Sequence, residues 1–534
     1  MSYIPVLFVF IPVVTSIIIY LFKNPKVSLI MFISQITMMV LFVLYALHLK
    51  EHPEDALIVF GGWNVRFAIT FYVDQLTLIF VGLTLLMWFV VMLYTYKTNK
   101  EETKFIFFLV FLQGVFMGLL QTNDLFNLFV FLELTTVIVT ILIAYKKSGQ
   151  SFHAAIYYLL INTLGAMFFL IGVILLYYVY GTINIQIILS EIHLHSNSDV
   201  VRLAYIFMVG GISVKAALFP VFTWLPRAHG VAQSTISALL SGLIVKAALY
   251  IFIRVNNEMF AAANYQMGEV FFWVGAVTAL VGVSFALSQK DLKQILAYHT
   301  ISQVGIMMMG IASSAHLSQL GGILHIFNHA LFKSLLFLGA GVVIKQYHSK
   351  KVYEIRGVLR TMPWTAILLI IGMLSISGAP LFNGFVSKSL VKYDFKYDQV
   401  KMFIFSLINL GTVTSFIKFS QILFGPKKDM VKESNIRQHL SMSILGLACL
   451  VIGIFYIPLG TSLLGESLRY VDLGYWRNWF EYVLYIGLGL IFYKFVISKD
   501  YYPTRKLREV SITFENANYL FIIYLLVLSA FLFF

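Results

Sequence analysis

The stretch NLFVFLELTTVIVT (residues 127–140) places one carboxylate, Glu133, at the centre of an otherwise uncharged apolar run. If this run crosses a lipid bilayer, an unpaired charge at its middle costs at least about 2.5 kcal/mol. We therefore expect the chain to supply a basic group that pairs with the carboxylate of Glu133.

The composition indicates that most of the chain lies in lipid. Hydrophobic residues make up 60% of the 534 residues and charged residues only 12%, which is about half of the charged share of soluble domains. We predict an all-α polytopic membrane protein. The first residues have no basic n-region and no small-residue cleavage pattern, so the first apolar stretch is expected to be a retained span.

Apolar windows of about 20 residues predict about sixteen transmembrane spans. They lie near residues 4–22, 27–48, 75–95, 104–120, 124–144, 153–180, 203–223, 232–253, 269–287, 294–311, 318–344, 364–390, 402–424, 440–464, 479–498 and 517–534. When the loops are assigned alternately to the two sides, most Lys and Arg residues outside the spans fall on one side. This is the bias of cytoplasmic loops, so both termini are predicted to lie outside the cell membrane.

The formal net charge of +14 follows mainly from these basic loops, which include residues 23–26, 97–104 and 427–437 and would face anionic lipid. No nucleic-acid partner is predicted. Lys418 and Lys494 lie near the cytoplasmic ends of their spans, where a long side chain can reach water, and we interpret both as structural.

Four other lysines lie inside the spans and can answer Glu133. Lys215, Lys246 and Lys333 lie near mid-span, and Lys388 lies in the outer half of an interrupted span. An apolar environment disfavours a charged lysine and a nearby carboxylate favours it, so such groups can gain and lose protons. Any one of them could form a structural ion pair, but one mid-span acid cannot pair with four bases. The sequence therefore predicts a proton pathway.

Histidines extend this pathway along one helix. In LHIFNHALFK (residues 324–333), His325, His329 and Lys333 recur every four residues, which places them on one slowly drifting helical stripe. Plain hydrogen-bonded packing is one alternative. A zinc site is another, but the metalloprotease pattern needs Glu where Ile326 stands, so no metal is predicted. His299 is expected either to add water-linked polarity or to satisfy a backbone carbonyl.

Two spans contain residues that break helices. The seventh span holds Pro220, and the twelfth holds Gly378 and Pro380. Such breaks are tolerated in membranes where the freed backbone groups line a cavity. If spans 4–8 and 9–13 are equivalent, the odd offset between the broken spans makes them inverted copies, a pattern typical of transport sites. We expect four regions: residues 1–100 with the first three spans, half-channels at 101–255 and 265–425, and C-terminal spans at 426–534.

Three long motifs carry a family resemblance. The stretches VKAALFPVFTWLPRAHGVAQSTISALLSGLIVKAALYIFIR (214–254), SQKDLKQILAYHTISQVGIMMMG (288–310) and LHIFNHALFKSLLFLGAG (324–341) resemble the antiporter-type subunits of respiratory complex I, membrane-bound hydrogenases and Mrp-type cation/proton antiporters. The stretch SGAPLFNGFVSKSL (377–390) is most similar to the D subunit of the Mrp-type antiporters and to its hydrogenase-associated relatives.

The resemblance implies a core of about fourteen helices with two inverted five-helix repeats, here followed by about two extra C-terminal helices. The residues that it assigns to proton translocation are Glu133, Lys215, Lys246, His325, His329, Lys333 and Lys388. Among them, Glu133 and Lys215 form the switching pair and Lys388 is the exit. The two extra helices are uniformly apolar, so neither is expected to be a lateral amphipathic helix.

The function predicted is that of a proton-translocating subunit in a multisubunit membrane complex, most similar to the D subunit of a Mrp-type Na+/H+ antiporter. The complex I member that this sequence resembles most in general pattern has Glu at the position of Lys388. Assignment of this chain to complex I is therefore less favoured. A proton-pumping subunit of a complex I-like NADH:quinone oxidoreductase or hydrogenase, and a subunit for inorganic-carbon uptake, are the alternatives. The expected partners are other membrane subunits, protons, Na+ and the lipid bilayer.

No cofactor or catalytic centre is predicted within this chain. Its one cysteine, Cys449, cannot form an internal disulfide or hold an iron–sulfur cluster alone. The sequence shows no GxGxxG or P-loop pattern and no nucleophile constellation. An assignment as an enzyme would therefore depend on partner subunits of a redox-driven complex.

Overall fold

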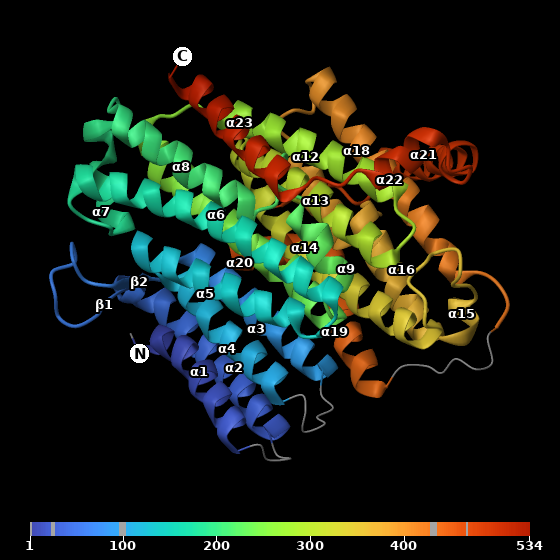
Figure 1. The fold of residues 1–534 in the computed structure, drawn as a ribbon, viewed down its shortest axis with the longest axis horizontal. Coiled ribbons are helices and arrows are strands. Elements are labelled where there is room, and N and C mark those ends of the chain that lie inside the picture. The colour runs from blue at the N-terminus through green and yellow to red at the C-terminus, as the bar shows by residue number, and fades with distance from the viewer. Residues whose placement is uncertain (1–2, 23–26, 96–102, 428–434, 466–467, 534) are drawn as a thin grey trace. The chain divides into compact units, whose positions relative to one another are not determined.

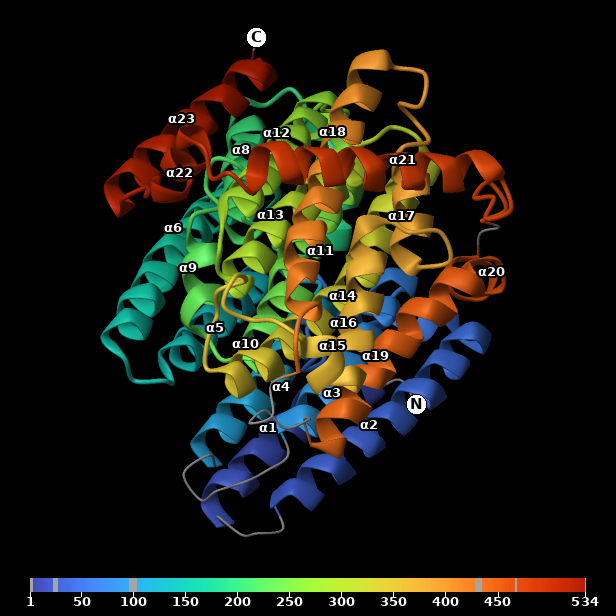
Figure 2. The same ribbon diagram turned by 90° about the vertical axis from the view of Figure 1, so that its right-hand side faces the viewer.

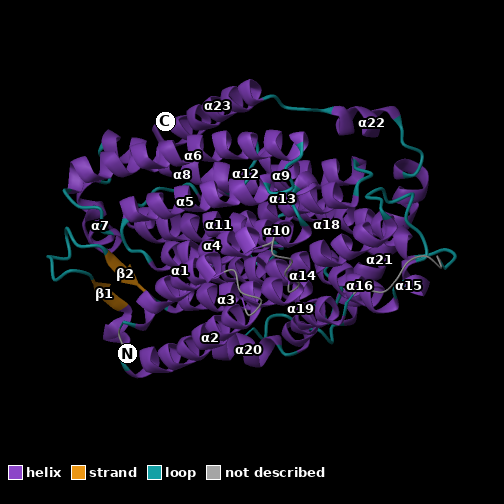
Figure 3. Cartoon of the chain, turned by 60° about the horizontal axis from the view of Figure 1, so that its bottom comes forward, coloured by secondary structure: helices purple, strands orange, loops and turns teal. Residues whose placement is uncertain are grey.

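The computed structural model describes residues 3–22, 27–95, 103–427, 435–465 and 468–533. Helices make up most of these residues, and two short strands, β1 (Leu57–Val59) and β2 (Thr70–Tyr72), pair antiparallel with Ile58 opposite Phe71 (Figure 3). Thirteen of the described helices are long and apolar enough to cross a membrane. The prediction of an all-α polytopic membrane protein is confirmed.

The chain divides into two compact units. The first comprises Met1–Ala216, Ala247–Gln266 and Tyr519–Phe534, and the second comprises Ala217–Lys246 and Met267–Asn518. The division does not follow the order of the chain, because a segment of about thirty residues after Ala216 packs with the second unit. Lys215 thus belongs to the first unit and Lys246 to the second.

The first unit contains mainly N-terminal helices. They are α1 (Ile4–Phe22), α2 (Val27–Glu51), η1 (Pro53–Ala56), α3 (Gln75–Thr95), α4 (Thr103–Gln121), α5 (Leu125–Ala144), α6 (Gly149–Tyr180), α7 (Ile185–Glu191), η3 (Ile192–His195), α8 (Asp199–Lys215), most of α11 (Val245–Phe252), η5 (Ile253–Met259), η6 (Phe260–Ala263) and most of α23 (Phe514–Phe533). Helix α1 packs against α2 and α4, and α6 packs against α5 and α8 (Figure 1).

The second unit contains the remaining helices. They are α9 (Trp224–Val231), α10 (Ser234–Leu239), η4 (Leu240–Ile244), α12 (Gly268–Ser288), α13 (Leu292–Ile311), α14 (His316–Tyr347), α15 (Val358–Thr361), α16 (Pro363–Ser377), α17 (Asn383–Val391), α18 (Gln399–Ser420), η7 (Gln421–Leu423), α19 (Ile436–Ile454), α20 (Tyr456–Leu464), α21 (Trp476–Phe492), η8 (Tyr493–Ile497) and α22 (Tyr502–Glu509). Of the basic loops that predict the orientation, residues 23–26, 96–102 and 428–434 lie outside the described residues.

Local sequence fixes where several helices begin. Asp124 caps α5, because its side chain accepts a 2.6 Å hydrogen bond from the backbone N–H of Asn127. Ser148 and Ser151 form a capping box at the start of α6, in which each side chain accepts from the other residue's backbone N–H. These caps satisfy donors that would otherwise lack partners, and they set the start of the two helices that carry Glu133 and its neighbour Thr163.

Both predicted helix interruptions are present. Helix α8 ends at Lys215, ahead of Pro220, and the chain resumes a helix only at α9. In the twelfth predicted span, Gly378 ends α16 with a left-handed backbone (φ 78°), and Pro380 lies between α16 and α17. A left-handed φ is easily reached by glycine, so this residue type suits the end of α16.

Helix α14 is buried along most of its length. It packs against α13, α16, α17 and α19 within the second unit, and 89% of its most apolar window is buried. A helix enclosed on all sides has to satisfy its polar side chains inside the protein. The histidine and lysine stripe of α14 is therefore placed in the interior of this unit.

Helix α21 lies across α18 instead of alongside it (Figures 1 and 2), and the two helices pack against each other. The sequence predicts an ordinary span at residues 479–498, because nearly all of its residues are apolar. The few polar side chains of α21 contact residues of α16 and α17, as described below, and composition alone does not reveal such contacts. This orientation is a finding of the tertiary structure.

Lys418 binds the end of a helix instead of reaching water. Its Nζ atom donates hydrogen bonds to the backbone carbonyls of Ala286 (3.1 Å), Leu287 (2.7 Å) and Gln289 (2.7 Å), where α12 ends. Carbonyls at a helix C-terminus lack intrahelical partners and attract cations. The side chain is buried, which differs from the sequence interpretation because these carbonyls give it polar partners within the protein.

A second cationic contact joins the same helix end to the segment before α22. Asp500 forms an ion pair with Lys290 at 2.6 Å and another with Arg508, whose Nε atom donates to the Ser288 carbonyl at 2.7 Å. Hydrogen bonds from Lys290 and Arg508 lower the pKa of Asp500 to about 2. The carboxylate therefore stays ionised at neutral pH and holds both cations.

Close packing of α12 against α13 depends on glycines that face each other. A Cβ atom on Gly305 would lie 2.5 Å from the Ala279 nitrogen and also overlap the Gly275 carbonyl. Because these are backbone atoms, we expect Gly305→Ala to push the helices apart and to lower stability by about 1–3 kcal/mol. The measurement is the thermal unfolding midpoint of the detergent-solubilised protein.

The matched control is Gly487→Ala on α21, where an added Cβ atom meets nothing within 4 Å. This variant should unfold at or above the wild-type temperature, since alanine favours a helix over glycine. Equal midpoints for the two variants would contradict the proposed packing role of Gly305.

Candidate functional site

Glu133 and Lys215 meet inside the first unit. The Lys215 Nζ atom lies 3.6 Å from Glu133 Oε1 and donates a 2.8 Å hydrogen bond to Thr136 Oγ1. Thr163 Oγ1 donates to the other carboxylate oxygen at 3.0 Å. Only 8% of Lys215 is exposed. The partner that the sequence requires for Glu133 is therefore Lys215, at a distance that permits Coulomb attraction but exceeds a hydrogen bond.

The end of α8 contributes to this pair. Lys215 is the last residue of α8, and Ala217 two positions later has a left-handed backbone (φ 55°). The C-terminal end of a helix carries a partial negative charge, which favours a cation there. Lys215 thus faces a full charge from Glu133 and a partial charge from its own helix end.

Lys246 is fully buried in the second unit and is held by a backbone carbonyl. Its Nζ atom donates to the Ser241 carbonyl. Ser241 lies in η4, a π-helical turn between α10 and α11. Such turns alter the regular backbone hydrogen bonding and are frequent at functional sites. The sequence gives no signal for this turn, because its residues are ordinary helix formers apart from Gly242.

The stripe of α14 is present, and its first member is fully hydrogen bonded. His325 Nδ1 lies 2.9 Å from Ser387 Oγ on α17, and Nε2 lies 3.0 Å from Gln303 Oε1 on α13. The ring centroids of His325 and His329 are 6.4 Å apart. Both nitrogens of His325 thus have protein partners: Nε2 can donate to the Gln303 amide oxygen and Nδ1 can accept from the Ser387 hydroxyl.

The next two members of the stripe are buried without partners. Among the described residues, the ring nitrogens of His329 and the Nζ atom of Lys333 have no hydrogen-bond partner, although Lys333 Nζ lies 5.7 Å from the centre of the Phe337 ring. Buried polar groups in proteins are nearly always satisfied by protein or by ordered water. Water is the partner that these two side chains require.

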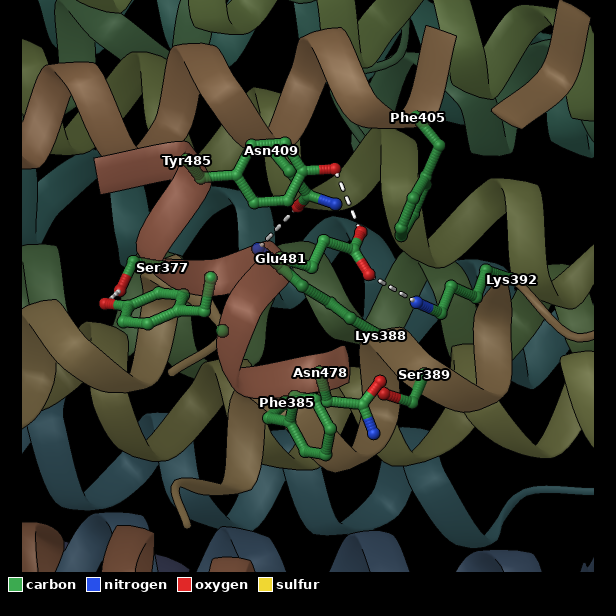
Figure 4. Close-up of a pocket in the computed structure, with 12 residues that line it drawn as sticks. Ser377, Phe385, Lys388, Ser389, Lys392, Phe405, Asn409, Asn478, Glu481 and Tyr485 are labelled. Atoms are coloured by element: carbon green, nitrogen blue, oxygen red, sulfur yellow. Dashed lines mark hydrogen bonds and ion pairs between the residues drawn. The ribbon is translucent and has the colours of Figure 1, made fainter. Parts of the chain in front are cut away.

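Lys388 lies where the broken twelfth span leaves a carbonyl free. Its Nζ atom donates to the Ile376 carbonyl at 2.8 Å and to Asn409 Oδ1 at 3.1 Å, and 5% of the residue is exposed (Figure 4). Ile376 belongs to the last turn of α16, whose carbonyls have no intrahelical partners. The helix break at Gly378 therefore provides an acceptor for Lys388.

Polar contacts that the sequence reasoning missed join α14 to α17. The Asn328 side chain donates to the Asn383 carbonyl at 2.8 Å, and the Asn383 side chain donates back to the Asn328 carbonyl at 3.4 Å. Together with the contact of His325 to Ser387, they tie the histidine stripe to the helix of Lys388. Asparagine inside an apolar span is the signal that could have identified them.

Two further histidines are buried in the second unit. His299 lies against Phe416, with ring centroids 4.8 Å apart, and in the described part of the chain neither ring nitrogen has a hydrogen-bond partner. Of the two roles expected for His299, the bond to a backbone carbonyl is therefore not formed among the described residues. His229, which the sequence analysis did not select, stacks on Phe337 at 4.6 Å and is fully buried. The sequence feature that could have identified His229 is its position directly after the broken seventh span.

Comparison with known proteins identifies relatives over most of the chain. The family model described as NADH:quinone oxidoreductase/Mrp antiporter, TM, matches residues 122–418. The D subunit of the Na(+)/H(+) antiporter of Alkalihalophilus pseudofirmus is 30% identical over 402 residues, which cover 73% of this chain and 81% of the relative. The putative antiporter subunit mnhD2 of Staphylococcus aureus is 29% identical over 381 residues, covering 70% and 76%.

Solved structures share the fold. A chain of the Mrp complex from Dietzia sp. and a chain of the membrane-bound sulfane sulfur reductase, an archaeal respiratory membrane complex, each match with a TM-score of 0.79 at 22% identity. Each match covers 90% of this chain and 99% of the other. Because the family match spans more than half of the sequence, this chain belongs to the NADH:quinone oxidoreductase/Mrp antiporter family of transmembrane proteins.

Proposed function

We propose that this chain is a proton-translocating subunit of a Mrp-type Na+/H+ antiporter, similar to the D subunit of such antiporters, and that it works with other membrane subunits. The observation that carries this proposal is the ion pair of Glu133 and Lys215 inside an apolar unit, in a chain whose curated relatives are antiporter subunits. The similar solved structures are multisubunit membrane complexes, which supports partners of this kind.

The pair of Glu133 and Lys215 acts as a switch in this proposal. While the carboxylate lies near Lys215, it favours the charged amine, and separation of the two removes this support. The 3.6 Å separation means that no direct hydrogen bond has to break. Thr136 and Thr163 hold one partner each, so the charges are positioned independently and can move apart without losing all of their contacts.

Lys246, Lys333 and Lys388 carry the proton onward with the two histidines of the stripe. The acceptors of Lys246 and Lys388 are backbone carbonyls, together with an amide oxygen for Lys388. These uncharged acceptors can accept a hydrogen bond from a charged ammonium group and also from a neutral amine, because both have N–H donors. Such lysines can change charge without losing their hydrogen bonds, which suits a proton pathway.

We also propose how the pathway is divided along the chain. Residues 101–255 and 265–425 form the two inverted half-channels, residues 1–100 and 426–534 flank them, and Lys388 is the exit. Both termini face the outside of the cell membrane, as the basic loops favour. Na+ is the coupled cation in this proposal, on the strength of the named relatives.

The test uses membrane vesicles that contain this chain and its partner subunits. A pH gradient is imposed, and NaCl or KCl is added while the internal pH is followed with a fluorescent dye. The proposal expects added Na+ to move protons and dissipate the gradient. Proton movement that ignores both salts and depends on a reductant would instead support the redox-driven alternative.

Lys215→Ala should reduce cation-driven proton movement by at least about tenfold without preventing insertion, because α8 keeps its apolar character but loses its titrating amine. Glu133→Gln should also lose most activity, since the charged form of Lys215 is then less favoured. The rate is measured in vesicles and normalised to the assembled complex. The control is Lys494→Ala, which removes an exposed lysine of η8. A silent Glu133→Gln together with a damaging Glu133→Asp would mean that size, and not charge, matters at this position.

Two replacements of Lys388 distinguish a role in proton binding from a purely structural role. We expect Lys388→Met to be more damaging than Lys388→Glu, because methionine keeps the length but cannot bind a proton, whereas glutamate can. Neither should prevent assembly. The same vesicle assay measures both, with Lys396→Met as a control at an exposed lysine beyond α17. Full activity of Lys388→Met would place the exit elsewhere in the chain.

A further inference from the structure

The pocket that adjoins Lys388 is closed partly by the C-terminal helix α21. The end of α16, α17 and α18 supply most of its lining, and α21 adds the side chains of Asn478, Glu481, Tyr482 and Tyr485 (Figure 4). The pocket encloses about 400 Å³ of empty space, including its open side. A carboxylate from a helix without a role in the proposed pathway thus shares a pocket with the exit lysine.

Glu481 reaches from this pocket to the surface of the unit. The Tyr485 hydroxyl donates to Glu481 Oε1 at 3.1 Å, and Lys392 Nζ lies 3.5 Å from Oε2. The Glu481 side chain is 37% exposed, whereas Lys388 is almost completely buried. Glu481 lies about ninety residues after Lys388 in the sequence, so no spacing predicts that they share a pocket, and it reaches this pocket only through the crossing of α21.

Two contacts that follow Glu481 along α21 hold this helix over the pocket. The Tyr482 and Ser377 hydroxyls are 2.8 Å apart, which links α21 to the end of α16. Further along α21, a Cβ atom on Gly489 would lie 3.0 Å from Ile417 and 3.2 Å from Thr414 of α18, so the two backbones approach closely there. Glu481 is therefore held in place by packing and hydrogen bonding.

We propose that Glu481 is the carboxylate through which protons pass between Lys388 and the outer aqueous phase. This inference rests on the proposed function of Lys388 as the exit. The ammonium group of Lys388 releases one proton to water in the pocket, the Glu481 carboxylate binds it, and the resulting carboxylic acid releases it to external water. Each group returns to its starting charge when Lys388 is protonated again, and no other reactant is needed.

The other groups around the pocket leave this role to Glu481. The titratable residues that line it are Lys388 and Lys392 from α17 and its C-terminal end, and Tyr482 and Tyr485 from α21, whereas α16 and α18 contribute only uncharged side chains. Lys392 already pairs with Glu481, and the two tyrosines carry phenol hydroxyls, so Glu481 supplies the one carboxylate among the residues that line this pocket. A carboxylate is the suitable acceptor.

A purely structural ion pair between Glu481 and Lys392 is the competing explanation, and two variants separate it from proton transfer. Glu481→Gln removes the proton acceptor and the ion pair, and Lys392→Gln removes only the ion pair. If Glu481 transfers protons, Glu481→Gln should lower Na+-driven proton movement by at least about tenfold, and Lys392→Gln by less than about twofold. Glu481→Asp should recover a large part of the lost rate, because it restores a carboxylate.

The assay uses vesicles that contain the full chain with its partner subunits, with NaCl as the added salt and rates normalised to assembled complex. Tyr482→Phe removes the hydroxyl contact of α21 to Ser377 but no charge, and it should lower the rate by less than Glu481→Gln, because the packing of α21 against α18 at Gly489 remains. Equal losses in Glu481→Gln and Lys392→Gln, or full activity in Glu481→Gln, would overturn the inference.

Assembly and the proposed function are controlled separately. If Glu481→Gln fails to assemble because Lys392 is left unpaired, the double variant Glu481→Gln/Lys392→Gln removes both charges, and its rate is compared with that of Lys392→Gln alone. An active double variant overturns the inference, and an inactive one supports it. If the wild type is inactive or Lys388→Met is fully active, the proposed function fails and the inference fails with it. Loss in Lys388→Met with an active Glu481→Gln overturns the inference alone.

Discussion

A charge enclosed by apolar side chains needs a partner, and this constraint explains how the first unit holds its central residues. Glu133 meets Lys215 at the last residue of α8, and the partial negative charge of a helix C-terminus also favours a cation at this position. The hydroxyls of Thr136 and Thr163 supply the remaining hydrogen bonds. Within the described residues Glu133 Oε1 has no hydrogen-bond partner and faces Lys215 across 3.6 Å, so the two charges are only loosely joined.

In the described residues of the second unit, three buried lysines are held by uncharged acceptors instead of carboxylates. Lys246 and Lys388 donate to backbone carbonyls, which become available at a π-helical turn and at the broken end of α16. Lys418 does the same at the end of α12. Irregular backbone therefore provides the acceptors that a regular helix keeps for itself. Since a carbonyl does not require its donor to be charged, these lysines keep their contacts in either protonation state.

Helix α21 adds a feature that the core of the second unit lacks. It lies across α18 and adds a carboxylate to the pocket of Lys388, whose hydrogen-bond acceptors among the described residues are uncharged. The position of Glu481 between a buried pocket and the surface follows from this crossing. A C-terminal segment that resembles a simple membrane span in composition thus contributes polar side chains to the interior of the unit.

The sequence by itself determined the helical membrane fold, the places where helices break, and the need of Glu133 for a basic partner, which the family resemblance identified as Lys215. Hydropathy, Gly and Pro positions, and the cost of an isolated buried charge are local or compositional properties, so they can be read without coordinates. Only the tertiary structure decided which acceptors hold Lys246 and Lys388, and that Glu481 comes to the pocket of Lys388. Backbone carbonyls carry no sequence signal, and the direction of α21 depends on contacts between residues far apart in the chain.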